Sequence, residues 1–311
     1  MTKAAVAASY GGPEVIEIVD RELPEPAEGE VVVEVKAIGV NPFDFKSYSG
    51  AFGTDESKLP IALGSEASGI VVAVGGIVEG PVGPIAVGDE VIVSGVNGTY
   101  TEKILAPARF VFPKPANLDW DVAAGVLAVA GTAYDALESV GVKSGDTVLV
   151  HGAAGGVGSV VAQLAKERGA TVIGTARARN HEALRAFGAE PVEYGDGLLG
   201  RVRAVAPDGI DAAIDAVGTD EAVDVSLELL TDRSKLVTIA AHGRAQADGF
   251  LTVGGPASME RRRLASPTLL EQAGAGVFEV TVAKTFPLDD VARAHTELQT
   301  AHPRGKFVLI P

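Results

Sequence analysis

The sequence predicts an α/β protein, and three changes of texture along the chain support this prediction. Residues 1–120 are rich in strand signals separated by turns that contain glycine and proline. Residues 121–266 instead alternate between helical segments and short strands of β-branched residues, which is typical of a parallel sheet. Residues 267–311 return to a helix, a strand, a second helix and a closing strand. At 311 residues the chain is long enough for two domains.

The strand signals of the first region come from apolar periodicity and from turn residues. Residues 31–36 carry valine at every second position, which predicts a half-buried strand. Apolar runs at 70–74 and 90–93 are bounded by glycines and predict two further strands. An Asn-Gly pair at 97–98 favours a hairpin turn, so we expect another strand at 99–102.

The most specific motif is a strand, a glycine-rich turn and a helix at residues 147–165. The turn carries Ala153, Gly155 and Gly158 at the three positions of a dinucleotide-binding fingerprint. A second short strand follows at 170–175. This order of elements predicts a βαβ unit that binds a dinucleotide cofactor at its first turn.

The small residues of this turn suit contact with a pyrophosphate. Gly155 would let the backbone approach the ligand, and Gly158 would let the helix lie close to the sheet. Backbone N–H groups at the start of a helix are donors for an anion. The residues that we expect to contact the cofactor here are Ala154, Gly155, Gly156, Val157 and Gly158. The alternative is a plain strand–helix connection with small residues for packing.

The end of the second strand indicates which dinucleotide binds. NAD sites usually carry an acidic residue at this point. Here Thr175 is followed by Arg177 and Arg179, and the first acidic residue is Glu182, inside the next helix. Because a guanidinium group makes paired, charge-assisted hydrogen bonds with a phosphate, we expect NADPH, with Thr175, Arg177 and Arg179 near it. Two solvated arginines near a helix start are the alternative.

Composition and charge exclude several functional classes. The formal net charge of −15 repels nucleic acid and anionic membranes, so we expect neither as a partner. The chain has no cysteine, which excludes disulfides, thiolate nucleophiles and zinc–cysteine sites. Residues 1–9 faintly resemble a signal peptide, but the apolar run is short and acidic residues follow, so a first strand is the better interpretation. No window is apolar and long enough to span a membrane, and we expect a cytoplasmic protein.

The order of these motifs resembles that of the medium-chain dehydrogenase/reductase superfamily. The segments that carry the resemblance are Val40–Lys46, Leu63–Gly69, Val87–Val91, Ala153–Gly158, Thr285–Leu288, Ala294–His295 and Arg304–Lys306. Within the superfamily the chain is most similar to the zinc-independent quinone oxidoreductases, the group that includes zeta-crystallin. The resemblance implies a GroES-like β-rich partial barrel formed by residues 1–120 and 267–311. It also implies a Rossmann nucleotide-binding domain at 121–266, with the active site in the cleft between the two domains.

The chain departs from the zinc-dependent members of this superfamily at the metal ligands. Those members place Cys where Asn41 stands and His where Ser65 stands, so Glu66 remains without soft partners. We therefore expect no metal. The histidines that we interpret as structural or solvated rather than as ligands are His151, His295 and His302.

Without a metal, hydride transfer needs an acceptor held over the nicotinamide and a hydrogen-bond donor for the acceptor oxygen. The resemblance places Asn41, Lys46 and Tyr48 on the segment that lines the cleft, and these are our expected catalytic residues. We expect Asn41 to donate to the nicotinamide ribose or to the substrate. We expect Lys46 and Tyr48 to polarise a carbonyl or to anchor the cofactor. The alternatives are a surface lysine and a packing aromatic residue.

Further candidates complete the expected cofactor site. Tyr194 is placed to stack on or hydrogen-bond the adenosine part, with simple packing as the alternative. The resemblance also implies that Thr132 and Tyr134 open a helix that faces the nucleotide. The remaining expected cofactor contacts are Val217, Ile239 and Ala240.

The sequence thus predicts an NADPH-dependent, zinc-independent oxidoreductase that reduces quinones or other α,β-unsaturated carbonyl compounds. An enoyl-thioester reductase is the nearest enzymatic alternative, although the only obvious basic cluster is Arg261–Arg263. A non-catalytic, crystallin-like NADPH-binding protein is the alternative from another class. The apolar run at 249–254 resembles a last sheet strand whose edge joins two subunits in this family, so we expect a homodimer.

Overall fold

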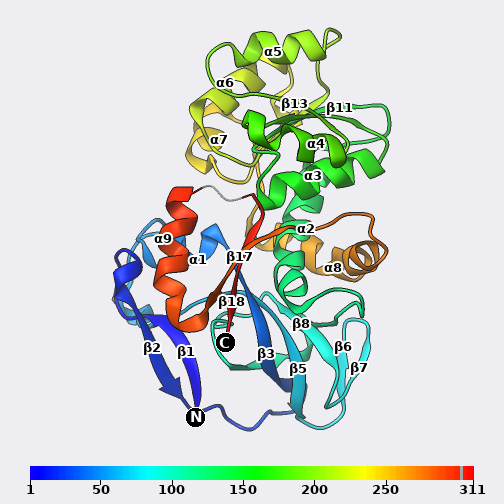
Figure 1. Cartoon of the computed structure of the whole chain (residues 1–311). Coiled ribbons are helices and arrows are strands. Elements are labelled where there is room, and N and C mark those ends of the chain that lie inside the picture. Colours follow the sequence, from blue (N-terminus) through cyan, green and yellow to red (C-terminus); the bar gives the residue numbers. More distant parts are fainter. Residues whose placement is uncertain (302–303) are drawn as a thin grey trace. The chain divides into compact units, whose positions relative to one another are not determined.

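The computed structural model describes residues 1–301 and 304–311 and divides the chain into two compact units (Figure 1). We call Met1–Ala128 together with Thr281–Pro311 unit 1, and Val129–Val280 unit 2. The domain boundaries drawn from the sequence lie earlier in the chain, at 120/121 and 266/267. The difference arises because helices run through both of those points, α2 from Trp120 to Val140 and α8 from Gly255 to Gly274.

Unit 1 consists mainly of antiparallel strands. Its helices are α1 (Pro42–Tyr48) and α9 (Val291–Ala301), and it also contains the part of α2 before Val129. Its strands are β1 (Thr2–Ala7), β2 (Ile16–Arg21), β3 (Glu30–Val40), β4 (Ile61–Ala62), β5 (Glu66–Val74), β6 (Val78–Gly80), β7 (Gly83–Ile85), β8 (Glu90–Ser94), β9 (Lys103–Pro107), β10 (Val111–Pro113), β17 (Val282–Pro287) and β18 (Lys306–Ile310).

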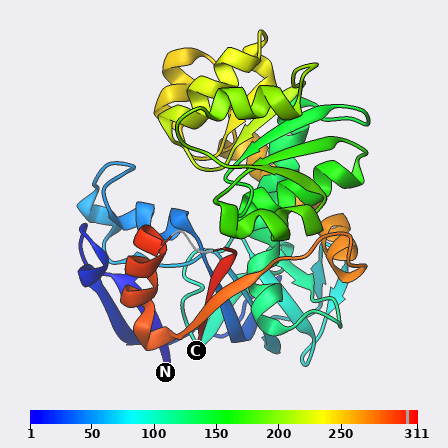
Figure 2. The same cartoon turned by 45° about the horizontal axis from the view of Figure 1, so that its top comes forward.

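The central strand of unit 1 is β3. In a seven-stranded sheet, the order is β10-β8-β5-β3-β18-β17, and β9 also pairs with β3. The predicted alternation of 31–36 is blurred because β3 is covered on both faces, and Val32 is buried together with Val31 and Val33. The closing strand lies between β3 and β17, so the end of the chain completes the sheet that its beginning forms (Figure 2). The strand expected at 99–102 is wrong, since only an isolated bridge forms between Ala4 and Thr101.

Unit 2 is a parallel, doubly wound domain. Its strands are β11 (Thr147–His151), β12 (Thr171–Thr175), β13 (Ala189–Val192), β14 (Ala212–Asp215), β15 (Leu236–Thr238) and β16 (Leu251–Thr252). Its helices, besides the rest of α2 and α8, are α3 (Gly156–Glu167), α4 (His181–Ala186), α5 (Leu198–Val205), α6 (Asp220–Leu229) and α7 (His242–Asp248).

The strand order of unit 2 is β13-β12-β11-β14-β15-β16, and every pair is parallel. This is the 3-2-1-4-5-6 order of a Rossmann fold, as the sequence predicts. Helices cover both faces of the sheet, with α3 on one side and α6 and α7 on the other (Figure 1). Among the helices of the described residues, none combines the length and the apolar character that crossing a bilayer requires.

A buried polar network joins α1 to α9 inside unit 1. His295 is fully buried, and its Nδ1 and Nε2 atoms lie 2.7 and 3.0 Å from the hydroxyl groups of Tyr48 and Tyr100. The Tyr100 hydroxyl donates to the carboxylate of Asp44 at 2.8 Å. Tyr100 therefore accepts from Nε2–H of His295, and Nδ1 accepts the proton of Tyr48. Burial lowers the pKa of His295 to about 4, which keeps the imidazole neutral.

Replacing His295 by Gln should make the stability of the protein less sensitive to acid. The unfolded histidine takes up a proton near pH 6.5, whereas the buried one does so only near pH 4. Stability from this group is thus complete above pH 6.5 and is lost as the pH falls towards 4. Between about pH 7.5 and about pH 5, the parent should lose about 2 kcal/mol of unfolding free energy that the variant retains.

Urea denaturation of both proteins at these two pH values measures the difference. Burial raises the pKa of Asp44 to about 7, so this carboxyl group acts in the opposite direction and adds stability as the pH falls. The comparison of parent and variant, rather than the parent alone, therefore isolates His295. An identical pH dependence in the two proteins would contradict the prediction.

Candidate functional site

The turn between β11 and α3 forms the anion-binding end of unit 2. Gly152 has a φ of +72°, which turns the chain sharply at the end of β11. Helix α3 then begins at Gly156 with Gly155 as its N-cap, and no side chain caps this helix start. The first N–H groups of the helix therefore lack partners within the helix and are directed towards any ligand at its positive end.

Two glycines of this turn serve different purposes. A Cβ atom on Gly158 would lie 2.3 Å from the carbonyl oxygen of Gly152 and 2.9 Å from Cα of Ala153, so only glycine lets α3 approach the turn. A Cβ atom on Gly155 would meet nothing closer than the Gly152 oxygen at 3.3 Å. The space beside Gly155 is thus much less restricted than that beside Gly158, and the turn fits a dinucleotide pyrophosphate.

The side chain of Thr175 holds this turn in place through a hydrogen bond to its backbone. The residue is buried at the end of β12, and its hydroxyl accepts from the backbone N–H of Gly152 at 3.2 Å. Nδ1 of the buried His151 lies 3.4 Å from the same hydroxyl. Its Nε2–H donates to the hydroxyl of Ser226 at 3.0 Å, because that hydroxyl gives its own proton to the carbonyl oxygen of Ala222. The expectation that Thr175 contacts the cofactor directly therefore needs correction, because its side chain is enclosed and holds the turn in place.

The arginines predicted beyond β12 lie on the surface. Arg177 and Arg179 are exposed, and Nε of Arg177 donates to the hydroxyl of Tyr194 at 2.6 Å. Tyr194 is 43% exposed, so it is not a core residue. The structure thus brings together a guanidinium group and a phenol from the ends of two neighbouring strands, which sequence spacing alone did not pair. Glu193 accepts from the N–H of Ala178 nearby, at 3.4 Å.

Two buried side chains shape the loops after β14 and β15. Oδ1 of Asp215 accepts from the N–H groups of Val217 and Gly218 at 3.0 and 2.8 Å. Its Oδ2 accepts from the hydroxyl of Thr238 at 2.6 Å. That hydroxyl in turn accepts from the N–H groups of Ala240 and Ala241 at 3.0 and 2.8 Å. Asp215 and Thr238 are not among the residues predicted from the sequence, although each is a polar residue that ends an apolar strand.

These loops carry three of the predicted cofactor residues at one edge of the sheet. Val217 is 47% exposed, and Ile239 and Ala240 are partly exposed. Because β14 pairs in parallel with β11, and β15 pairs in parallel with β14, their carboxyl ends lie at the same edge as the turn of α3. Ligands of open α/β sheets bind at this edge.

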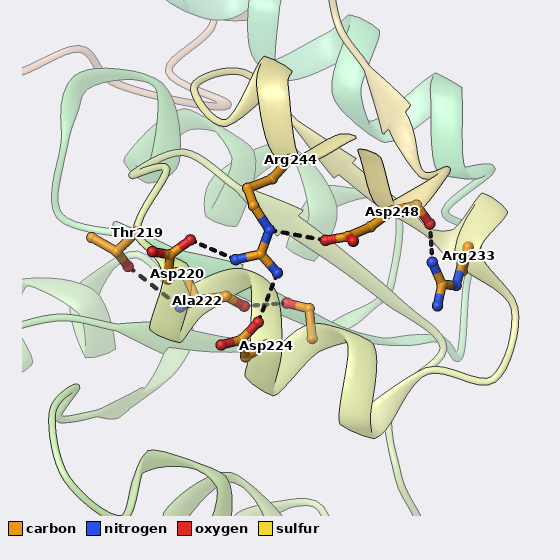
Figure 3. A network of polar contacts seen from close by, with 8 residues as sticks. Thr219, Asp220, Ala222, Asp224, Arg233, Arg244 and Asp248 are labelled. Atoms are coloured by element: carbon orange, nitrogen blue, oxygen red, sulfur yellow. Dashed lines mark hydrogen bonds and ion pairs between the residues drawn. The ribbon is translucent and has the colours of Figure 1, made fainter. Parts of the chain in front are cut away.

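An arginine of α7 ties the helices behind these loops together. Arg244 forms ion pairs with Asp220 and Asp224 of α6 at 2.5 and 2.8 Å and with Asp248 at 2.9 Å (Figure 3). These hydrogen bonds raise the pKa of the guanidinium group above its usual value. The cluster fixes α7 against α6, and the loop at 239–241 leads directly into α7.

Helix α2 carries the remaining candidates of unit 2. The expectation that Thr132 and Tyr134 open a helix is wrong, because both lie inside the continuous helix Trp120–Val140. Thr132 is half-buried. The ring of Tyr134 lies under the guanidinium group of Arg168 at 5.6 Å and lines a surface hollow between α2, α3 and α8. Tyr134 is therefore part of the packing between helices.

Asn41 is the most constrained candidate of unit 1. It is the N-cap of α1, and its backbone N–H donates to Asp44 at 2.8 Å. Its side-chain amide lies between two buried charged groups, Glu66 of β5 and Lys306 of β18. These two form an ion pair of 2.9 Å, with side chains only 1% and 5% exposed. In the sequence, Lys306 belongs only to the family motif Arg304–Lys306, which by itself assigns the lysine no role.

The other two catalytic candidates of unit 1 differ in environment. Lys46 lies half-buried in the last turn of α1, and among the described residues it has no ion-pair partner. Tyr48 is wrong as a substrate donor, because it is 1% exposed and its hydroxyl is bound to His295 within unit 1. Burial raises the pKa of Tyr48 above its usual value. The alternative of a packing aromatic residue describes it correctly.

The positions that hold zinc in related dehydrogenases carry a different donor set here. Asn41 and Glu66 already bind the ammonium group of Lys306, which leaves no place for a second cation beside them. His295 and His151 each use their ring nitrogens in hydrogen bonds inside the protein. His302 lies outside the described residues. The chemistry of these donors does not fit a zinc ion.

Alanine substitutions at the two glycines of the turn should have different consequences. Gly158→Ala should lower the urea midpoint and abolish NADPH binding, because its Cβ meets backbone atoms that cannot yield without moving α3. Gly155→Ala should lose much less stability than Gly158→Ala, since Gly155 has a φ of −76° and its Cβ would have one tight contact, at 3.3 Å from the Gly152 oxygen. Its affinity for NADPH should nevertheless fall by about tenfold or more, because the methyl group stands where the pyrophosphate approaches.

For each variant, urea denaturation measures the stability, and titration of NADPH fluorescence measures the affinity for NADPH. Unchanged NADPH affinity in a folded Gly155→Ala protein would show that the ligand does not approach this turn.

Comparison with known proteins identifies the family. The model of the alcohol dehydrogenase GroES-like domain matches residues 27–116, and that of the zinc-binding dehydrogenases matches residues 187–309. A quinone oxidoreductase from Pseudomonas aeruginosa is 34% identical, with 100% of both chains covered. A chloroplastic NADPH-dependent alkenal/one oxidoreductase from Arabidopsis thaliana is 30% identical, covering 99% of this chain and 79% of the relative.

Structural similarity agrees with these matches. The crystal structure of Escherichia coli quinone oxidoreductase complexed with NADPH superimposes with a TM-score of 0.86 at 30% identity, covering 100% of both chains. The matches confirm the resemblance found in the sequence motifs and the GroES-like nature of unit 1. The chain belongs to the zeta-crystallin-like quinone oxidoreductase family of the medium-chain dehydrogenase/reductase superfamily.

Proposed function

We propose that this protein is an NADPH-dependent, zinc-independent oxidoreductase that transfers a hydride to quinones or related α,β-unsaturated carbonyl compounds. The observation that carries the proposal is the open helix start at Gly155, with Arg177 and Tyr194 joined beyond the neighbouring strand. The family supports it, because its members include quinone oxidoreductases and an NADPH-dependent alkenal/one oxidoreductase.

Each part of the cofactor edge has a distinct task in this proposal. NADPH, when bound, supplies the hydride, and the chain supplies position and polarity. The N–H groups of Gly156, Val157 and Gly158 at the start of α3 hold the pyrophosphate. Arg177 and Arg179 hold the 2′-phosphate.

The remaining residues of this edge surround the rest of the cofactor. Tyr194 contacts the adenosine part. Val217, Ile239, Ala240 and Thr132 line the path towards the nicotinamide.

The acceptor is served by residues of α1 in this proposal. Asn41 offers an amide donor, and Lys46 a partly buried ammonium group without an ion-pair partner among the described residues. Such donors stabilise the negative charge that develops on the acceptor oxygen. Quinones depend less on this polarisation than simple enones do, because their reduced form is an aromatic diol.

The structure weakens the enoyl-thioester alternative at one specific place. That reaction expects a basic channel for the phosphates of the carrier, and Arg261–Arg263 was the only candidate. Arg261 and Arg262 instead pair with the buried carboxylate of Asp135, at 2.6 and 3.4 Å. Arg263 pairs with Glu260 at 2.7 Å. The cluster is thus largely neutralised within the helices that carry it.

Turnover separates the proposed enzyme from its alternatives. The protein should oxidise NADPH in the presence of 1,4-benzoquinone or of an enone such as methyl vinyl ketone, and much more slowly with crotonyl-CoA. Loss of NADPH absorbance measures the three rates, and a chelator should leave them unchanged. NADPH binding without turnover on any of the three acceptors would favour the crystallin-like alternative. Preference for the thioester would favour the enoyl reductase.

Removing either arginine should discriminate between the two nicotinamide cofactors. Arg177→Ala and Arg179→Ala each remove one charge-assisted contact, which should cost about 1.5–3 kcal/mol, or roughly ten- to a hundredfold in affinity for NADPH. Binding of NADH should hardly change, because NADH lacks the 2′-phosphate. Tryptophan or NADPH fluorescence titration measures both affinities. Equal losses for the two cofactors would refute the phosphate assignment.

We also propose a cytoplasmic homodimer. Strand β16 (Leu251–Thr252) is the last strand of the sheet of unit 2, so one of its edges has no partner among the described residues. Pairing with the same strand of a second copy would cover that edge. Light scattering at micromolar concentration should give twice the chain mass of 31.7 kDa. Replacing Thr252 by Pro should produce monomers, and a parental protein of single-chain mass would overturn the proposal.

A further inference from the structure

The buried cluster around Lys306 uses every proton of its ammonium group. Nζ donates to the carbonyl oxygen of Val40 at 3.0 Å, to Oδ1 of Asn41 at 2.5 Å and to Oε1 of Glu66 at 2.9 Å. Helix α2 lies close to the lysine chain, because a Cβ atom on Gly125 would stand 2.9 Å from its Cε atom. The ammonium group therefore has one fixed position.

Glu66 is equally fully engaged. Its Oε1 accepts from Lys306 and from Nδ2 of Asn41 at 2.9 Å, and its Oε2 accepts from the N–H of Ala128 at 3.0 Å. A Cβ atom on Gly39 would stand 2.5 Å from Oε1, so the strand also confines the carboxylate. One positive and one negative group thus face the two ends of the same amide.

This arrangement determines which way the Asn41 amide points. An ammonium group can only donate and a carboxylate can only accept, so Oδ1 must face Lys306 and Nδ2 must face Glu66. Rotation of the amide by half a turn would place its NH₂ group against the ammonium group of Lys306 and its oxygen against the carboxylate of Glu66. Nδ2 carries two protons, and the second has no acceptor among the residues that the structure describes. Asn41 is only partly buried, so this N–H is open to a ligand.

We propose that Lys306 and Glu66 are positioning residues that fix the orientation of the Asn41 amide and polarise it. Its second N–H then donates a hydrogen bond to the acceptor or to the nicotinamide during hydride transfer. The ammonium group of Lys306, bound to Oδ1, draws electron density from the amide. This strengthens the amide N–H groups as donors, because linked hydrogen bonds in the protein interior polarise one another. This inference rests on the proposed function, in which Asn41 serves the acceptor or the nicotinamide.

A double-mutant cycle separates this role from a merely structural one. Lys306→Met keeps the length of the side chain and removes its charge. It should lower kcat on methyl vinyl ketone by about tenfold, less than the roughly hundredfold cost of losing a donor outright. In the background of Asn41→Ala, the same change should lower kcat by less than twofold, because no amide remains to be positioned. Equal fold losses in the two backgrounds would overturn the proposal.

Lys114 supplies the matched control. It is also a buried lysine of unit 1, 4% exposed, and it pairs with Glu90 at 3.0 Å without touching Asn41. Lys114→Met should lower the urea midpoint and leave kcat within twofold of the parent. If Lys306→Met does not fold, Glu66→Gln takes its place in the cycle, because it keeps the volume and removes the negative charge that faces Nδ2.

A spectroscopic measurement tests the inference without any turnover. The chain has four asparagines, so selective ¹⁵N labelling gives a simple side-chain amide spectrum, in which the signal absent from Asn41→Ala belongs to Asn41. This signal should move in Lys306→Met and stay in Lys114→Met. An unmoved signal would overturn the proposal even in a protein that reduces no acceptor. A parent without turnover, but with the expected shift, would contradict the proposed function alone.

Discussion

The ion pair of Lys306 with Glu66 is the contact on which unit 1 depends. Lys306 stands at the first residue of the last strand, and its partners lie on β5 and at the junction of β3 and α1. Removing one partner of a buried ion pair typically costs about 3–5 kcal/mol, because a charge is left without compensation. The pair therefore joins the end of the chain to its beginning, and it does so beside the residue that heads α1.

The two units present their functional groups in different ways. In unit 2 the groups proposed to hold the cofactor are mostly backbone N–H groups, at the start of α3 and in the loops that Asp215 and Thr238 hold in place. Buried side chains there, such as Thr175 and Asp215, bind the backbone of the turns and hold it in place. In unit 1 the candidate group at the start of α1 is instead a side chain, that of Asn41, and a buried polar network orients it. A backbone cradle suits a cofactor that all members of a family share, whereas side chains are free to vary with the acceptor.

The charges beside Asn41 are balanced within unit 1. Lys306 brings one positive charge, and Glu66 neutralises it. A second polar network, formed by Asp44, Tyr100, His295 and Tyr48, also holds α1 and contains a neutral imidazole. The backbone N–H of Asn41 donates to Asp44, so the two networks meet at the start of this seven-residue helix.

The sequence by itself determined the features that local pattern encodes. The turn of α3, the alternating helices and strands that predict a parallel sheet, and the closing strand at 306–310 all follow from residues within a few positions of one another. Only the tertiary structure decided the burial and the hydrogen bonds of side chains whose partners are distant in the chain. Tyr48 is a core residue because His295, 247 positions away, accepts its proton. Asn41 meets Lys306 across 265 positions. Burial and hydrogen-bond partners are properties of the assembled sheet and helices, so no local periodicity could assign them.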